Sequence, residues 1–93
     1  MMSDIPKNIE KLKGEDRDKE ILRVGLIAEL DAINLYEQLA AMCDDLKIKK
    51  VLMDIAKEEK THVGEFLELL LERDREQVDQ LNKGKEEVEE LTG

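Results

Sequence analysis

Two long stretches of helical periodicity, which meet at a short break, constrain the fold of this 93-residue chain more than any other feature. The first runs from about residue 17 to residue 43, and the second from about residue 46 to residue 73. The break, Cys43–Leu46, contains two aspartates that can cap the second helix. Because so short a connection makes two helices antiparallel neighbours, the sequence predicts an all-α fold built on a two-helix hairpin.

The first sixteen residues are polar and contain Pro6 and Gly14, so we expect an N-terminal arm before the hairpin. Asp16 or Asp18 is placed to cap the first helix, where an acidic side chain also suits the helix dipole. The hairpin unit itself is expected to span residues 17–75.

The remaining residues, 76–93, are expected to form a short C-terminal helical segment. Asp74–Leu81 is typical of a helical turn and Lys85–Leu91 of a last small helix. Between them, Asn82–Gly84 combines residues that favour turns, which predicts a break in the helix.

The chain is strongly acidic, with 42% charged residues and a formal net charge of −9. This charge argues against nucleic acids and anionic membranes as partners, because both require a basic face. No apolar run approaches a membrane span and the N-terminus has no apolar signal-peptide core, so the cytoplasm is the expected compartment. The single cysteine, Cys43, excludes an internal disulfide framework.

The first long helix carries more apolar surface than one neighbouring helix can cover. A surface helix needs a single apolar stripe, so self-association is expected. Gly25 and Gly64 lie inside the predicted helices, where glycine costs about 1 kcal/mol relative to alanine. We expect these glycines to allow a close approach of helices at an interface. The apolar surface combines one face (Leu22, Leu26, Ala32, Ile33, Tyr36, Leu39, Ala40, Cys43) with a second flank (Val24, Ile27, Ala28, Leu35).

Glu59 and His62 interrupt the apolar stripe of the second helix. They are i, i+3 neighbours and therefore lie on one helix face. Burial of a carboxylate and an imidazole is unfavourable unless something compensates them, and a metal ion is the leading candidate. Taken alone, the pair is more typical of a solvated glutamate and a hydrogen-bonded core histidine than of metal ligands. The stripe is otherwise formed by Ile48, Leu52, Ile55, Phe66 and Leu69.

A third polar residue, Glu29, is predicted to lie at the same level of the hairpin. The positions midway between Glu29 and Glu59, and midway between Glu29 and His62, both fall inside the predicted turn. At about 1.5 Å per residue, all three side chains are then roughly 24 Å from the turn. Three polar groups at one depth of an apolar seam strengthen the metal hypothesis.

Two carboxylates and one imidazole suit iron or manganese and are acceptable to zinc. A helix-bundle di-iron site takes a Glu from each of two helices and a Glu-x-x-His from each of the other two. This chain holds half of that set. A two-fold homodimer would form a four-helix bundle and complete the site.

Two segments carry a resemblance to a known family. Glu29–Tyr36 (ELDAINLY) and Glu58–His62 (EEKTH) resemble the encapsulated ferritins, the ferritin-like cargo proteins of encapsulin nanocompartments. The resemblance covers roughly residues 17–75, and the C-terminal segments are similar as well. It implies a ferroxidase centre at a homodimer interface, dimers assembled into a ring-shaped decamer, and iron stored as mineral inside the encapsulin shell.

The resemblance also implies roles for individual residues. Glu29, Glu59 and His62 match the iron ligands, with Glu59 as the carboxylate that bridges two irons. Tyr36 matches an aromatic residue near the centre. Asp31 matches one member of an acidic pair proposed as a metal entrance, although the other position is Ala28 here. Some relatives are fused to the shell protein, and this chain ends without an obvious shell-targeting tail.

The sequence leaves two alternatives to a ferroxidase open. A rubrerythrin-like peroxide reductase would share the di-iron site, but such enzymes usually carry a cysteine-rich iron module that one cysteine cannot make. A helical scaffold module with a structural metal is a non-enzymatic alternative. The sequence does not decide whether the metal is iron, manganese or zinc, or whether the oxidant is oxygen or peroxide.

Overall fold

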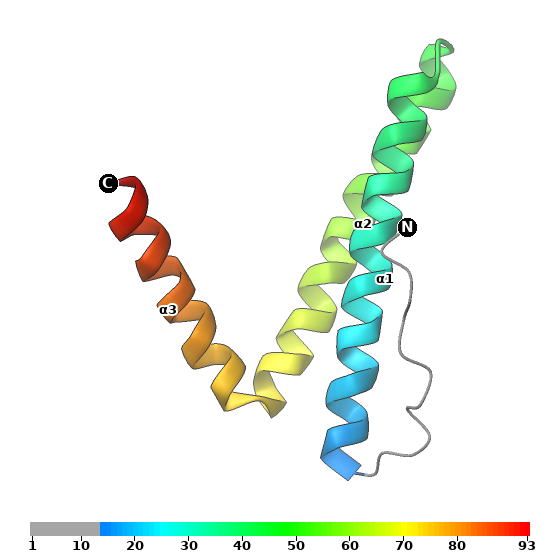
Figure 1. The fold of residues 1–93 in the computed structure, drawn as a ribbon. Helices are drawn as coiled ribbons and strands as arrows, with labels where there is room; N and C mark the ends of the chain where they lie inside the picture. Colours follow the sequence, from blue (N-terminus) through cyan, green and yellow to red (C-terminus); the bar gives the residue numbers. More distant parts are fainter. Residues whose placement is uncertain (1–13) are drawn as a thin grey trace.

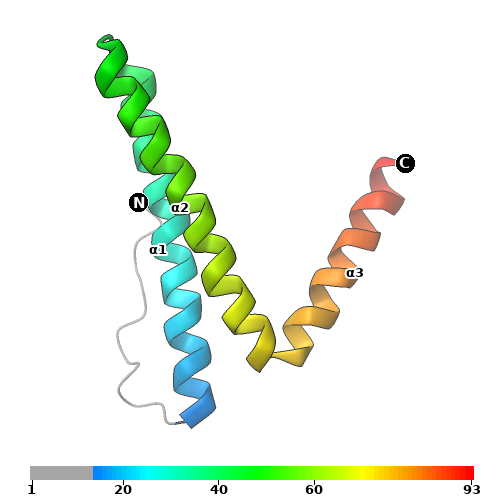
Figure 2. The same cartoon turned by 180° about the vertical axis from the view of Figure 1, so that it is seen from behind.

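The computed structural model describes residues 14–93, which form three helices and no strand. Helix α1 (Gly14–Met42) and helix α2 (Leu46–Arg73) lie side by side as an antiparallel hairpin, and α3 (Arg75–Thr92) departs from its base. The three helices together form a V, seen from one side in Figure 1 and from behind in Figure 2. The predicted all-α hairpin with a C-terminal helix is confirmed. Predictions for the first thirteen residues lie outside the described part of the chain.

The connection between α1 and α2 is short because Asp45 starts α2 immediately. Its Oδ1 accepts hydrogen bonds from the backbone N–H groups of Lys47 at 2.9 Å and Ile48 at 3.0 Å, as a helix N-cap does. The predicted aspartate cap is therefore confirmed. Cys43 follows the last turn of α1, where its backbone N–H donates to the carbonyl of Ala40.

The predicted start of the first helix was wrong by three residues. Helix α1 begins at Gly14, whose φ of +61° lies in the left-handed region that glycine adopts readily. Asp16 and Asp18 consequently lie within the helix and do not precede it as caps. Asp16, in the first turn with Glu15, still complements the helix dipole.

The hairpin core is thin. Few of its apolar side chains are buried. Gly25 allows α1 to lie close to Phe66 of α2, because a Cβ at position 25 would lie 2.9 Å from Cε1 of the Phe66 ring. A close approach at Gly25 therefore occurs inside the hairpin, whereas a Cβ at Gly64 meets nothing within 4 Å; the interface role expected for the two glycines stays a prediction. The buried apolar residues of the described chain are Leu22, Ala40, Ala56 and Leu70.

Many large apolar side chains remain exposed along the hairpin. Large exposed apolar side chains in such number are typical of surfaces that contact another molecule. The surplus apolar surface expected from the sequence is therefore present, and it extends over both helices. It is formed by Ile21, Leu30, Leu35, Leu39, Met42, Leu46, Ile48, Val51, Met53 and Leu69.

The predicted break in the C-terminal segment was wrong. Helix α3 is continuous from Arg75 to Thr92 and passes through Asn82–Gly84. One glycine costs a helix about 1 kcal/mol, and the surrounding Glu, Lys, Gln and Leu residues favour the helix. Both ends are also capped, by the side chain of Asp74 and by the N–H of Gly93 on the carbonyl of Glu89. None of the three described helices is long and apolar enough to cross a membrane.

Candidate metal centre

Glu29, Glu59 and His62 come together between the two helices of the hairpin. Nδ1 of His62 lies 3.4 Å from Oε2 of Glu29 on α1 and 3.3 Å from Oε2 of Glu59 on α2. One ligand atom from each residue can be chosen so that all three lie within 4.8 Å of one another. The predicted alignment of the three residues at one level is confirmed.

The spacing of these atoms fits a shared metal ion. Donors about 2.1 Å from one ion lie about 3.0–3.4 Å apart at octahedral or tetrahedral angles. The observed separations of 3.3 and 3.4 Å lie in that range. They exceed the usual 2.7–3.2 Å of a hydrogen bond between nitrogen and oxygen. The distances from the imidazole to both carboxylates are therefore compatible with ligands of one cation, and all three donor atoms lie within 4.8 Å of one another.

The charge of the centre also favours a cation. Within residues 14–93, neither Glu29 nor Glu59 forms an ion pair with a lysine or an arginine. Lys60 is adjacent to Glu59 in sequence, but it reaches across the hairpin to Glu37 on α1, at 3.1 Å. Two carboxylates thus face a single imidazole, and a divalent ion would balance their charge.

The centre is open on its histidine side. The side chains of Glu29 and Glu59 are 19% exposed, whereas the imidazole of His62 is 43% exposed. The carboxylates are held in the seam between the helices, and the imidazole reaches toward the surface. One hairpin therefore supplies ligands from two sides and leaves a third side uncovered.

The two weaker site predictions lie outside this group. Asp31 is buried, at 6% exposed, and is two residues from Glu29. Two positions turn a helical side chain by about 200°, so Asp31 points away from the centre formed by its own hairpin. Tyr36 is half-buried on α1. The metal entrance at Asp31 and the role of Tyr36 near the centre stay predictions.

Sequence reasoning missed two contacts that frame the centre. The Lys60–Glu37 ion pair joins α1 to α2 on the turn side of the centre. The Arg23–Asp74 ion pair, at 3.0 Å, joins α1 to the junction of α2 and α3. Both partners of each pair are ordinary surface residue types, so only the three-dimensional arrangement distinguishes them.

Comparison with known proteins places this chain in a family. A family model described as EncFtn-like matches residues 4–89, which is almost the whole chain. The chain belongs to the EncFtn-like family. The family resemblance expected from the two sequence segments is therefore confirmed.

Two curated proteins are similar to this member of the EncFtn-like family. A ferritin-like–encapsulin shell fusion protein of Pyrococcus furiosus is 54% identical over 95 aligned positions, which include 100% of this chain. The encapsulin nanocompartment cargo protein EncC of Myxococcus xanthus is 39% identical over 56 positions, or 60% of this chain. The chain spans 28% of the length of the first relative, and the second match covers 43% of that relative.

A solved structure shares the fold. The crystal structure of the encapsulated ferritin domain from Pyrococcus furiosus matches with a TM-score of 0.86 and 53% sequence identity. The match covers 98% of this chain and 93% of that domain. The V of hairpin and α3 is therefore the fold of an encapsulated ferritin domain.

Proposed function

We propose that this protein is a ferroxidase, which oxidises Fe(II) to Fe(III) at a di-iron site formed across a homodimer interface. The observation that carries the proposal is the group of Glu29, Glu59 and His62, spaced as ligands and open on the side of His62. Oxygen-rich sites with one nitrogen suit iron. The family membership of the chain supports iron over the other ions that such a site accepts.

The homodimer is supported by the apolar surface around the centre. Along the stripe of α2, Ile48 lies exposed toward the turn and Leu69 lies exposed toward the base. Two open hollows accompany them, one of about 290 Å³ bounded by Lys47, Ile48, Val51 and Leu52, and one of about 240 Å³ beside Leu69. A two-fold axis through the centre would place the turn of one hairpin against the base of its copy, and so cover both hollows.

Each residue of the half-site has a role in this proposal. Glu29 and His62 would serve as terminal ligands, and Glu59 would be the carboxylate shared by the two ions. Two copies of the half-site hold four carboxylates, which nearly balance two Fe(II) ions and allow their burial. Iron bound there would supply one-electron redox chemistry, with O2 or peroxide as the electron acceptor. The hairpins hold the ions and exclude bulk water.

The assembly and location of the protein are part of the proposal. The names of the two curated relatives connect them with encapsulin, one as a fusion with the shell and the other as cargo. We infer that this chain also works inside an encapsulin nanocompartment in the cytoplasm, where the shell would store the oxidised iron. The resemblance to encapsulated ferritins further supports the assembly of five such dimers into a ring-shaped decamer.

Aerobic Fe(II) oxidation by purified variants tests this function. Glu59→Ala and His62→Ala are expected to abolish fast oxidation and leave the helical content by circular dichroism unchanged. Glu58→Ala is the matched control, because Glu58 is exposed and adjacent to Glu59 but outside the centre. Oxidation at the parental rate by both site variants would rule out the assignment.

Two further measurements separate the alternatives. A rate that depends on peroxide and is negligible with O2 would favour a peroxide reductase of the rubrerythrin kind. Analytical ultracentrifugation with and without Fe(II) addresses the scaffold alternative. An oligomer that ignores Fe(II), together with no oxidation, would favour a helical scaffold.

A further inference from the structure

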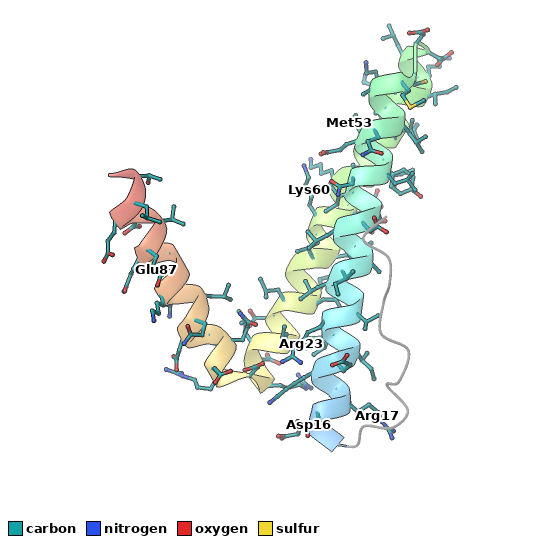
Figure 3. The ribbon with its side chains drawn as sticks, viewed as in Figure 1. Asp16, Arg17, Arg23, Met53, Lys60 and Glu87 are labelled. Atoms are coloured by element: carbon teal, nitrogen blue, oxygen red, sulfur yellow. The ribbon has the colours of Figure 1, made fainter. Side chains whose placement is uncertain are left out.

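A single residue joins α2 to α3. Asp74 lies between Arg73 and Arg75 and is only 9% exposed. Its Oδ1 accepts a hydrogen bond from the backbone N–H of Gln77 at 3.0 Å, which caps α3. Its Oδ2 accepts a hydrogen bond from Nη2 of Arg23 on α1, also at 3.0 Å. One carboxylate at the end of α2 therefore caps α3 and binds α1; Figure 3 shows Arg23 beside this junction.

Little else restrains α3. Among residues 14–93, α3 packs against α2 near the junction and does not pack against α1, and none of its side chains is buried. Beyond the first turns, Leu81, Val88 and Leu91 remain exposed. Near the junction, Gln77 and Arg23 border an open hollow of about 350 Å³ together with apolar residues of the hairpin. Within one chain, apolar packing therefore does not fix the direction of α3.

The charges around Asp74 single out Arg23 as its partner. Arg73 donates from Nη1 to the carbonyl of Leu69 at 3.0 Å, and it also lies near Glu72. Arg75 pairs with Asp79 at 3.2 Å. The two arginines adjacent to Asp74 in sequence are thus directed elsewhere, and the guanidinium from α1 takes the carboxylate.

The protonation of Asp74 agrees with this geometry. The N–H of Gln77 has the largest effect and lowers the pKa of the carboxyl group, against the opposing effect of burial. The hydrogen bond from Arg23 and the nearby charge of Lys19 lower the pKa further. Asp74 therefore stays charged at neutral pH and keeps both of its partners.

We propose that the Arg23–Asp74 ion pair fixes the direction in which α3 leaves the hairpin. The cap on Gln77 alone would start a helix but would not orient that helix against α1. The bond to Arg23 supplies this restraint, since it ties the junction to the far side of the hairpin. Both residues are positioning residues, and the inference does not depend on metal binding or oxidation.

Pulsed electron paramagnetic resonance between two spin labels tests the proposal on the full chain. Cysteines at exposed positions 50 on α2 and 87 on α3 carry the labels in a Cys43→Ser background, and excess unlabelled chain isolates distances within one chain. The parent is expected to give one narrow distance distribution. Arg23→Gln is expected to lose the narrow peak with the helical content unchanged.

Arg75→Gln is the matched control, because it removes the same charge one residue from Asp74 and breaks a pair that lies within α3. It is expected to keep the narrow peak, and Arg23→Lys is expected to restore part of it. Asp74→Asn keeps an acceptor for Gln77 but loses the charge, and it should match Arg23→Gln. The proposal is overturned if Arg23→Gln keeps the narrow peak, or if Arg75→Gln broadens the distance distribution as much as Arg23→Gln does. If Arg23→Gln loses helicity, Asp74→Asn is judged by the same two criteria.

Discussion

The hairpin and α3 are both built from amphipathic helix, but they are held in place by different means. Helices α1 and α2 bury Leu22, Ala40, Ala56 and Leu70 between them, and the Phe66 ring packs onto Gly25. Helix α3 buries none of its side chains and depends on its junction with the hairpin. The hairpin is thus fixed by packing along its length, and α3 by a few polar contacts at one end. Substitutions in the two units should therefore have unequal effects.

The largest difference is expected from the removal of leucine side chains. Leu70→Ala leaves a cavity at a fully buried position of α2 and should lower the free energy of unfolding by about 2–5 kcal/mol. Leu81→Ala, at 44% exposed on α3, should cost less than about 1 kcal/mol. Urea unfolding at one fixed protein concentration measures both. Equal losses would mean that α3 is packed in solution as firmly as the hairpin.

Metal binding should stabilise the hairpin and leave α3 unaffected. Fe(II) without oxygen, at a hundredfold excess over its dissociation constant, should add about 2.7 kcal/mol to the free energy of unfolding. Amide hydrogen exchange should slow in α1 and α2 and stay unchanged in α3. His62→Ala should abolish the gain, and Glu58→Ala should retain it. Protection that appears equally in α3 would contradict the separation of the two units.

Two glycines offer a matched pair of smaller effects. Gly25→Ala brings a methyl group against the Phe66 ring, and overpacking of about 1–3 kcal/mol should exceed the helix-propensity gain of about 1 kcal/mol. Gly84→Ala on α3 meets open space and should stabilise the chain by up to about 1 kcal/mol. Thermal melts of both variants show whether each substitution stabilises or destabilises the chain. Phe66→Leu should relieve the Gly25→Ala defect, and a stabilising Gly25→Ala would show that the ring moves away freely.

The smallest effect should be the acid response of the junction. Because the pKa of Asp74 is lowered in the folded chain, its stabilising contribution is complete above the ordinary aspartate pKa of about 3.9 and is lost as the pH falls through the folded value. Arg23 and Lys19 on α1 are the cations that act on it. The amide proton shift of Gln77 should report the titration with a midpoint below the ordinary value. Asp74→Asn should remove this titration, and a midpoint at or above the ordinary value would contradict the assigned hydrogen bonds.

The hairpin and its centre could be predicted from the sequence because they depend on regular spacing. A fixed rise per residue on two antiparallel helices places Glu29 opposite Glu59 and His62 once the turn is known. The turn itself is marked by Asp45, whose side chain prefers the N-cap position. Both arguments use only local geometry and the antiparallel arrangement of the two helices.

The remaining features depend on contacts that no local pattern encodes. The Arg23–Asp74 pair joins positions 51 residues apart, and it depends on how the end of α2 lies against α1 in three dimensions. The start at Gly14 and the continuity of α3 through Gly84 were missed for another reason. Glycine can end a helix, begin one or lie within one, and the capping of the flanking segments decides between these outcomes.

Because a single residue joins α3 to the hairpin, a small rotation at this residue moves the far end of α3 over a large distance. Its 18 residues rise by about 1.5 Å each, so a rotation of only 10° at Asp74 would carry the far end of the helix through about 5 Å. Any surface presented by Val88 and Leu91 is therefore located with an accuracy that depends on the torsion angles of Asp74. A small angular change at the base of the hairpin is enough to decide whether a surface near Leu91 contacts the surface of a partner.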